Sequence, residues 1–366
     1  MALVAITYNL KKEPKKGLPK DFYAECDDED TINAIEEALK KGGFRTARVE
    51  ADENAFLKIK KLRPTIVFNI AEGIKGRNRE SQIPAMLEVL GIPYTASDPM
   101  TLSIGLNKAM TKQILMQNNI PTPPFQIFYT KDDKISKKLK FPLIVKPLYE
   151  GSSKGIKNDS LVRTEAELRR KVEEITLNYD EPALVENFLS GREFTVAVIG
   201  NEDPVALPIL ELVFDQLPEG ANPIYSFEAK WLWDTKEKKI NMVSCPARIS
   251  ARLRKRIEAI ALQTYKALNV RDWCRIDIRL DSKNRPNVLE INPLPGIIPD
   301  PEEHSNLPTM WYSMGLKYEQ LINTVLYHAA KRYGLNLKFK RGMVINDIKK
   351  RVEKAYRSIR RRKISK

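Results

Sequence analysis

Short strand-like runs alternate with helical patterns over the first 98 residues, and this alternation limits the fold more than any other feature of the chain. The expected strands are Leu3–Tyr8, Arg45–Glu50 and residues 65–69. Residues 30–39 place apolar side chains on one helical face before Gly42 and Gly43 end the pattern, and residues 81–90 form a second helix. Such an alternation is typical of a parallel sheet covered by helices, so we expect an α/β layer.

Length and composition narrow the class of protein. The chain has 366 residues, of which 42% are hydrophobic, and can bury more than one core. No run approaches the roughly 20 apolar residues of a membrane span, and the first residues carry no basic leader, so we expect a cytoplasmic protein. Cys26, Cys245 and Cys274 stand far apart and only two histidines are present, which favours reduced thiols and leaves few ligands for zinc.

Most of the positive charge lies in residues 331–366. This segment holds 15 Lys and Arg residues against two acidic ones, and leaves only about +2 of the net +15 for the rest of the chain. Apolar residues recur in it at the three- or four-residue spacing of an amphipathic helix: Ile345, Ile348, Val352, Tyr356 and Ile359. The helix either packs on the body or remains a loose tail, or its basic face touches an anionic membrane surface or nucleic acid. No specific nucleic-acid partner is expected.

Two β-rich runs, residues 275–280 and 287–292, resemble a hairpin that carries oxygen ligands. Because side chains alternate along a strand, Asp277, Glu290 and Asn292 can point to one face. Such a set suits magnesium, which takes a few protein oxygens and completes its shell with phosphates and water. The alternative is a solvated hairpin whose outward positions are acidic. The Asn-Pro-Leu-Pro-Gly run that ends at Gly296 favours the metal site.

A second pattern indicates a phosphate site. Residues 143–147 read as a strand that delivers Lys146 to a small, polar loop, residues 150–155. A lysine charge and loop backbone amides together can hold phosphate, although the loop is not a Walker A sequence. An ordinary surface loop remains the alternative.

In this order and spacing, the motifs resemble those of D-alanine–D-alanine ligases over residues 65–328. The matching segments are residues 91–97, 107–112, 146–153, 191–196, 275–277 and 290–296. The resemblance implies the α/β ATP-grasp fold with three domains, in which central and C-terminal α+β domains clasp ATP. The expected boundaries are residues 1–98, 99–188 and 189–330, followed by the basic tail 331–366.

The resemblance also implies roles for individual residues. Lys108 and Lys146 would bind ATP phosphates beside Ser152 and Ser153. The adenine hinge would be formed by Glu186, Phe188 and Leu189, with Glu193 on the ribose. Two magnesium ions, with manganese as an alternative metal, would be held by Asp277, Glu290 and Asn292. Lys230, from a lid at residues 217–233, would reach the transferred phosphate, and Ser152 would orient the substrate.

The implied reaction joins a carboxylate to an amine. The carboxylate attacks the γ-phosphate to give an acyl-phosphate, and Arg275 and the N–H of Gly296 would stabilise the oxyanion formed when the amine attacks. Ser305 would bind a substrate carboxylate. Trp231 would stand in place of the family's lid tyrosine on the substrate side. The alternative for Trp231 and Trp233 is that both are core aromatics. Partners would be small amino-acid or peptide substrates, and a homodimer is left open.

The chain departs from the family on the substrate side. The first strand runs into residues 7–12 without the family's glutamate, residues 69–73 replace its His-Gly, and residues 297–303 form a longer segment. These departures leave two alternatives open: a ligase for a different amino acid or peptide, and a non-catalytic nucleotide-binding regulatory protein.

Overall fold

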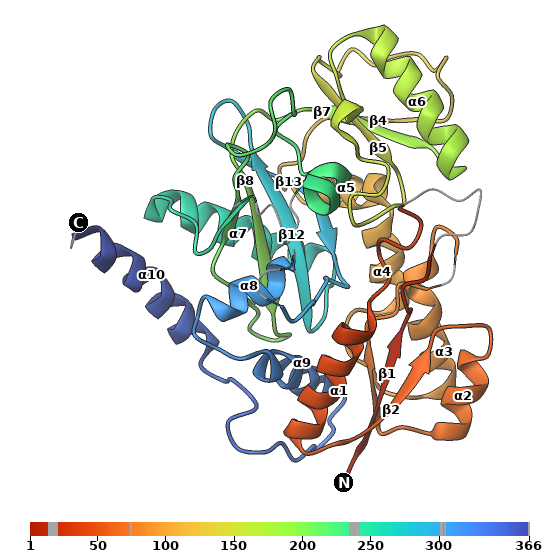
Figure 1. Ribbon diagram of the computed structural model, residues 1–366, viewed down its shortest axis with the longest axis vertical. Helices are drawn as coiled ribbons and strands as arrows, with labels where there is room; N and C mark the ends of the chain where they lie inside the picture. The colour runs from red at the N-terminus through yellow and green to blue at the C-terminus, as the bar shows by residue number, and fades with distance from the viewer. Residues whose placement is uncertain are drawn as a thin grey trace.

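The computed structural model describes residues 1–13, 21–73, 75–233, 240, 242–300, 303 and 305–364, without the side chains of Trp231 and of residues from Ile359 onward. Its described strands form three sheets, of three, four and six strands (Figure 1). The arrangement confirms the expected α/β class. Among the described residues, no helix is long and apolar enough to cross a membrane.

The N-terminal layer is the predicted parallel sheet. β1 (Leu3–Tyr8) lies between β2 (Arg45–Glu50) and β3 (Ile66–Asn69), and both pairs are parallel. The helices of this layer are α1 (Glu29–Gly42), α2 (Ala55–Leu62) and α3 (Gln82–Leu90). Asp28 caps α1 by accepting a hydrogen bond from the Thr31 N–H, and Gly43 ends the helix in a left-handed conformation with φ of 101°.

The central sheet has the order β4-β7-β5-β6. Its strands are β4 (Phe125–Phe128), β7 (Ala183–Asn187), β5 (Leu143–Pro147) and β6 (Leu161–Val162). Helix α6 (Glu165–Tyr179) packs on this sheet and begins with a capping box between Thr164 and Glu167. Helices α4 (Pro99–Leu106) and α5 (Lys108–Gln117) connect the N-terminal layer to this part.

The C-terminal sheet is antiparallel and has the order β11-β10-β8-β12-β13, with β9 paired to β8. The strands are β8 (Glu193–Ile199), β9 (Val205–Ala206), β10 (Leu210–Leu212), β11 (Val243–Ser244), β12 (Trp273–Leu280) and β13 (Pro286–Asn292). The expected hairpin is therefore formed by β12 and β13. Helix α7 (Ala251–Ala267) packs against this sheet, and α8 (Asn306–Tyr312) contacts β8.

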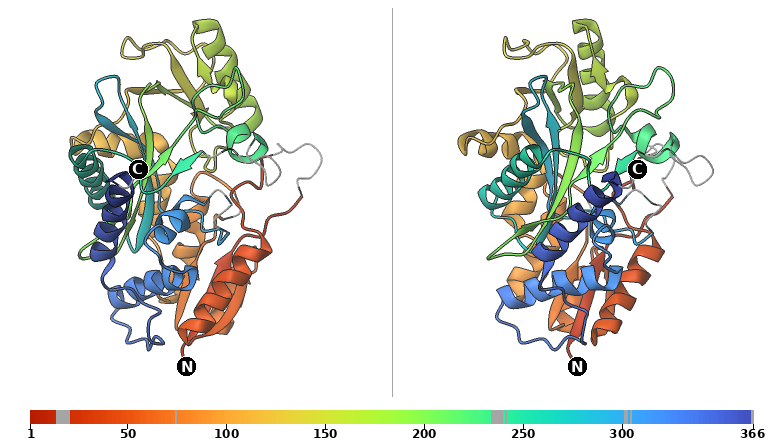
Figure 2. Two further views of the ribbon diagram at one scale, coloured as in Figure 1. Left: turned by 60° about the vertical axis from the view of Figure 1, so that its left-hand side comes forward. Right: turned by 90° about the vertical axis from the view of Figure 1, so that its left-hand side faces the viewer.

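The basic C-terminal segment packs on the body. Helix α9 (Tyr318–Arg332) lies on α1, where Asn323 donates a hydrogen bond to the Ala38 carbonyl at 2.7 Å. Helix α10 (Ile348–Ile364) lies beside α7 (Figure 2) and buries the predicted apolar stripe at Ile348, Val352 and Tyr356. The sequence left open whether this segment packs on the body, remains a loose tail or binds an anionic surface, and the structure shows packing. The side chain of Ile359, the last residue of the predicted stripe, lies outside the described residues.

The largest hydrophobic core joins the two ends of the chain. It includes Val4 from β1, Trp273 from β12, Leu326 from α9 and Val352 from α10. Each sheet falls within one of the three predicted domain segments, whose boundaries we retain as a proposal.

Candidate functional site

Two cavities meet between the three sheets. The larger lobe, of about 210 Å³, lies toward the N-terminal layer, and the smaller lobe, of about 100 Å³, lies between the central and C-terminal sheets. They share a wall made of six residues, all from the predicted phosphate loop, lid and hairpin: Glu150, Gly151, Ser152, Lys230, Arg275 and Glu290. The two lobes therefore form one cleft with a common junction.

The smaller lobe contains the predicted nucleotide residues. Its lining includes Lys146, Ser153, Glu186, Phe188, Leu189 and Glu193. Ile144, Leu212 and Leu289 add apolar surface on which a flat ring can stack. At one wall, Glu193 pairs with Arg279 at 2.6 Å, and the Arg279 guanidinium lies 4.6 Å from the centre of the Phe188 ring. The sequence predicted the charged and hinge residues of this lobe, but neither Arg279 nor the apolar residues that line it.

Glu186 lies between two buried lysines. Its carboxylate pairs with Lys146 at 2.7 Å and with Lys112 at 2.6 Å, and all three side chains are at most 5% exposed. Burial alone would lower the pKa of Lys146, but Glu186, together with Glu290 and Glu193, outweighs burial and holds that pKa above its usual value. We predicted Glu186 as part of the adenine hinge, and the structure shows that it also balances the charges of Lys112 and Lys146. Lys112 was not singled out from the sequence, although it lies one helical turn after Lys108 on α5.

The hairpin brings the predicted oxygen ligands together. Asp277 on β12 is paired directly with Glu290 on β13, and Asn292 donates a hydrogen bond to Asp277 at 3.2 Å. Arg275 and Thr195 also contact Asp277, at 3.0 and 2.5 Å. The Glu290 side chain has no hydrogen bond or ion pair within the described part of the chain, and it lines both lobes. Two carboxylates and an amide oxygen fit a hard divalent cation that takes its remaining ligands from phosphate and water.

Two further lysines face the junction. Lys108 is buried and donates a hydrogen bond to the Glu150 carbonyl, and burial lowers its pKa. Lys230 lies in the short helical turn Ala229–Trp233, where burial, followed by the nearby Arg275, lowers its pKa to about 8. Both lysines and Glu290 line the larger lobe, so the carboxylate pair and the cations face the same cleft.

The phosphate loop is held in an unusual backbone conformation. Ser152, Ser153 and Gly155 have φ angles of 49°, 61° and 69°, in the left-handed region that side chains other than glycine seldom adopt. A Cβ on Gly151 would lie 2.5 Å from the Glu25 carboxylate, and one on Gly155 would lie 2.4 Å from Pro147. Close packing at both ends therefore requires these glycines.

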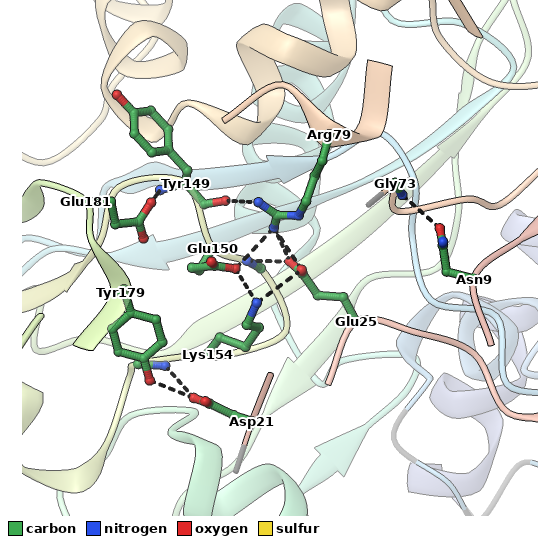
Figure 3. Close-up of polar contacts among 12 residues, drawn as sticks. Asn9, Asp21, Glu25, Gly73, Arg79, Tyr149, Glu150, Lys154, Tyr179 and Glu181 are labelled. Atoms are coloured by element: carbon green, nitrogen blue, oxygen red, sulfur yellow. Dashed lines mark hydrogen bonds and ion pairs between the residues drawn. The ribbon is translucent and has the colours of Figure 1, made fainter. Parts of the chain in front are cut away.

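Carboxylates of the N-terminal segment hold both ends of this loop (Figure 3). Glu25 accepts a hydrogen bond from the Gly151 N–H at 2.7 Å, and Asp21 accepts one from the Gly155 N–H at 3.0 Å. Arg79 donates to both Glu25 oxygens at 2.8 Å, and Lys154 lies 3.6 Å from the same carboxylate. Burial alone would raise the pKa of Glu25, but these two cations hold it below its usual value. No motif in the sequence indicated this network.

The lid segment touches the phosphate loop. Ser153 donates a hydrogen bond to the Tyr225 carbonyl at 2.9 Å, and the Phe227 N–H donates to Ile156 at 2.7 Å. Trp233 packs in a small cluster with Ile240 and Met242, which favours the core reading for this tryptophan. The side chain of Trp231 lies outside the described residues, so its predicted substrate role stays a prediction.

Gly296 and Ser305 lie on the wall of the larger lobe. The Ser305 hydroxyl accepts a hydrogen bond from the Ile298 N–H at 2.8 Å, and the side chain is buried. A Cβ on Gly296 would approach this hydroxyl to 3.5 Å. The structure thus brings the predicted oxyanion donors Arg275 and Gly296 into one lobe with Ser305, while their chemical roles remain predictions.

Comparison with known proteins identifies relatives of the chain. Residues 114–327 match the family described as D-ala D-ala ligase C-terminus. The chain is 34% identical to the uncharacterized protein y4sG of Sinorhizobium fredii, over 82% of this chain and 88% of that protein. It is 32% identical to a D-alanine–D-alanine ligase of Carboxydothermus hydrogenoformans, over 81% of this chain and 91% of the ligase.

A solved structure shows the same fold. The crystal structure of a D-alanine–D-alanine ligase from Bacillus anthracis, complexed with ATP, matches with a TM-score of 0.67 and 21% sequence identity. The match covers 91% of this chain and 99% of the ligase.

Proposed function

The chain belongs to the D-alanine–D-alanine ligase family of ATP-grasp enzymes, and we propose that it joins an amino-acid carboxylate to an amine at the expense of ATP. The observation that carries the proposal is the junction of the two lobes. A nucleotide in the smaller lobe and a carboxylate in the larger lobe would meet beside Ser152, Lys230, Arg275 and Glu290.

The first step is phosphoryl transfer, which enzymes accelerate mainly by positioning and by balancing charge. We assign the adenine to the surface beside Phe188 and Leu189, and the phosphates to Lys108, Lys146 and the Ser152–Ser153 loop. Asp277, Glu290 and Asn292 would hold magnesium or manganese, and a divalent cation there neutralises the triphosphate charge. The substrate carboxylate then attacks the γ-phosphate, and ADP leaves.

The second step forms the amide. An amine attacks the carbonyl of the acyl-phosphate, and phosphate departs from the tetrahedral intermediate. Arg275 and the Gly296 N–H donate to the oxyanion, since both line the lobe in which the carbonyl would lie. Contact between the lid, at Tyr225 and Phe227, and the phosphate loop shields the acyl-phosphate from water. We also propose a cytoplasmic location, because the reaction consumes ATP.

Product analysis tests the proposal. The purified protein is incubated with MgATP and a panel of amino acids of both enantiomers and short peptides, and ADP, phosphate and new amides are quantified. We expect ADP and phosphate in equal amounts, together with an amide product. MgATP binding without turnover across the whole panel would instead favour the non-catalytic regulatory alternative.

A further inference from the structure

We propose that the larger lobe binds a second cationic group of the substrate, so that the preferred carboxylate-bearing substrate is a diamino or guanidino amino acid. This inference rests on the proposed ligase function and names its substrate class. The site is the wall that the N-terminal layer contributes to the lobe, where Asp27, Glu72 and Glu80 lie.

Close contact between two loops builds this wall. Gly73, after β3, has a φ of 86°, and a Cβ there would lie 2.0 Å from the Arg79 carbonyl. Asn9 fixes the same loop by accepting a hydrogen bond from the Gly73 N–H at 2.8 Å (Figure 3). The side chains that flank this contact, Glu72 and Glu80, therefore share the lobe. They follow the carboxyl end of a parallel strand, where ligands of α/β layers commonly bind.

Other acidic groups of the wall are already engaged. Arg79 and Lys154 occupy Glu25, as Figure 3 shows, and the Gly151 N–H donates a hydrogen bond to the same carboxylate. Asp28 caps helix α1. These carboxylates have structural partners and are not available to a ligand without breaking those contacts.

Three carboxylates of the wall lack such partners. Within the described residues, no hydrogen bond or ion pair engages the side chain of Asp27, Glu72 or Glu80. Glu80 is only 8% exposed and still lines the lobe. A buried carboxylate without a partner is costly, and a cation that enters the lobe removes that cost. Burial raises the pKa of Glu80 to about 7, although Arg79 and Lys108 lie near enough to oppose the shift, and burial with the nearby Asp28 raises the pKa of Asp27 to about 8.

The nearby protein cations do not supply the missing partner. Arg79 is directed at Glu25 and Glu150, and Lys108 donates to the Glu150 carbonyl. Lys11 lines the lobe but has an interaction of its own. The wall thus holds more carboxyl groups than the surrounding cations pair with, and a cation that binds there would favour their ionised form.

The number of carboxylates without a partner indicates whether the substrate carries one cationic group or two. An alanine would bring one ammonium group, while its carboxylate would be directed to Lys230 and Arg275 across the lobe. One ammonium leaves two of the three carboxylates without a partner. A substrate with a second ammonium, or with a guanidinium that binds a carboxylate through two hydrogen bonds, matches the wall better.

Substrate competition tests this inference. Phosphate release is measured for alanine, norleucine, 2,3-diaminopropionate, ornithine, lysine and arginine, each in both enantiomers and with one common amine acceptor. We expect at least one diamino or guanidino acid to exceed alanine at least tenfold in kcat/KM. Turnover of alanine or norleucine at or above the rate of all cationic substrates would overturn the inference and leave the ligase proposal standing. Silence with these amino acids and with the whole panel of amino acids and short peptides described above would reject the ligase proposal itself.

Variants place the effect on the wall. Glu80→Gln and Glu72→Gln should raise KM for the cationic substrate at least tenfold, with kcat and the rate for norleucine changed less than threefold. Glu53→Gln, an exposed carboxylate of the same layer, is the matched control and should change neither. MgADP affinity reports on the smaller lobe and should stay within twofold. An equal loss with both substrate classes, or a loss of MgADP affinity, would mean a structural role and would contradict the inference.

Discussion

Glu25 accepts a hydrogen bond from the backbone N–H of Gly151 at 2.7 Å, across 126 positions of the sequence. This contact links the N-terminal layer to the loop that we assign to the ATP phosphates. Arg79 holds Glu25 in place through both of its oxygens. The N-terminal segment therefore positions a loop of the catalytic cleft without being assigned to touch the nucleotide.

Replacing Arg79 tests this link. Arg79→Met removes one of the two cations that Glu25 and Glu150 share and leaves Lys154 as the other, so the anchor of the loop should weaken. We expect faster hydrogen exchange at the amides of Gly151 and Gly155 and at least a tenfold rise in KM for ATP. Arg79→Lys retains the charge but loses the hydrogen bond that a second guanidinium nitrogen donates to the Tyr149 carbonyl. Its exchange rates and its KM for ATP should lie between those of the wild type and those of Arg79→Met. Unchanged exchange in Arg79→Met would show that the anchor has no effect on the loop.

The buried lysines around Glu186 lead to a stability prediction. Glu186→Gln leaves Lys112 and Lys146 without a counter-charge in a site that excludes water. Removing one partner of a buried ion pair costs about 3–5 kcal/mol, so the free energy of unfolding, measured with urea, should fall by that order. The double variant Lys112→Met/Glu186→Gln also removes the positive charge of Lys112, so its free energy of unfolding should lie above that of Glu186→Gln. Equal stability of the single variant and the wild type would contradict the prediction.

Lys230 leads to a pH prediction. Its pKa, lowered to about 8 by burial, lies below that of a free lysine, so the side chain is charged below pH 8 and neutral above it. Because a charged lysine favours the phosphate, kcat/KM for ATP should fall as the pH rises through about 8. Lys230→Arg keeps its charge throughout this range, and the residual activity of this variant should not show the decline. A wild-type profile that is flat from pH 7 to 9.5 would contradict the assignment.

The C-terminal helix should contribute to stability. Val352 is buried in the main core and Tyr356 accepts a hydrogen bond from the Ile209 N–H at 2.8 Å. Val352→Ala should therefore lower the free energy of unfolding by about 1–3 kcal/mol. Lys354→Ala, on the exposed face of the same helix, should change it by less than about 0.5 kcal/mol. Equal effects of the two substitutions would argue that the helix is not docked in solution.

The sequence predicted the parts of the fold that depend on local pattern. Alternation along 275–280 and 287–292 placed Asp277 and Glu290 on one face, and the antiparallel register pairs them directly. The spacing of Ile348 and Val352 predicted the apolar stripe of the last helix, but its packing partners, among them Arg254 on α7, lie far away in the sequence. The comparisons confirm the family and the fold, whereas the roles of the site residues stay predictions.

The sequence could not predict contacts between distant loops. Glu25 stands in an irregular segment without a period. Its partner Arg79 lies 54 positions away in the same layer, and its partner Gly151 lies 126 positions away, after a strand of the central sheet. Lys112 follows Lys108 by one helical turn, but its pairing with Glu186 depends on how α5 meets the central sheet. Such contacts depend on tertiary packing, which no motif in the chain encodes.

The transfer of an oxygen atom tests the central claim most directly. A substrate amino acid labelled with ¹⁸O in its carboxylate is converted with MgATP, and the released phosphate is analysed by mass spectrometry. If the carboxylate attacks the γ-phosphate at the junction of the two lobes, one ¹⁸O atom appears in each phosphate released with the amide. Amide formation with unlabelled phosphate would contradict the acyl-phosphate route and the assignment of the junction as its site.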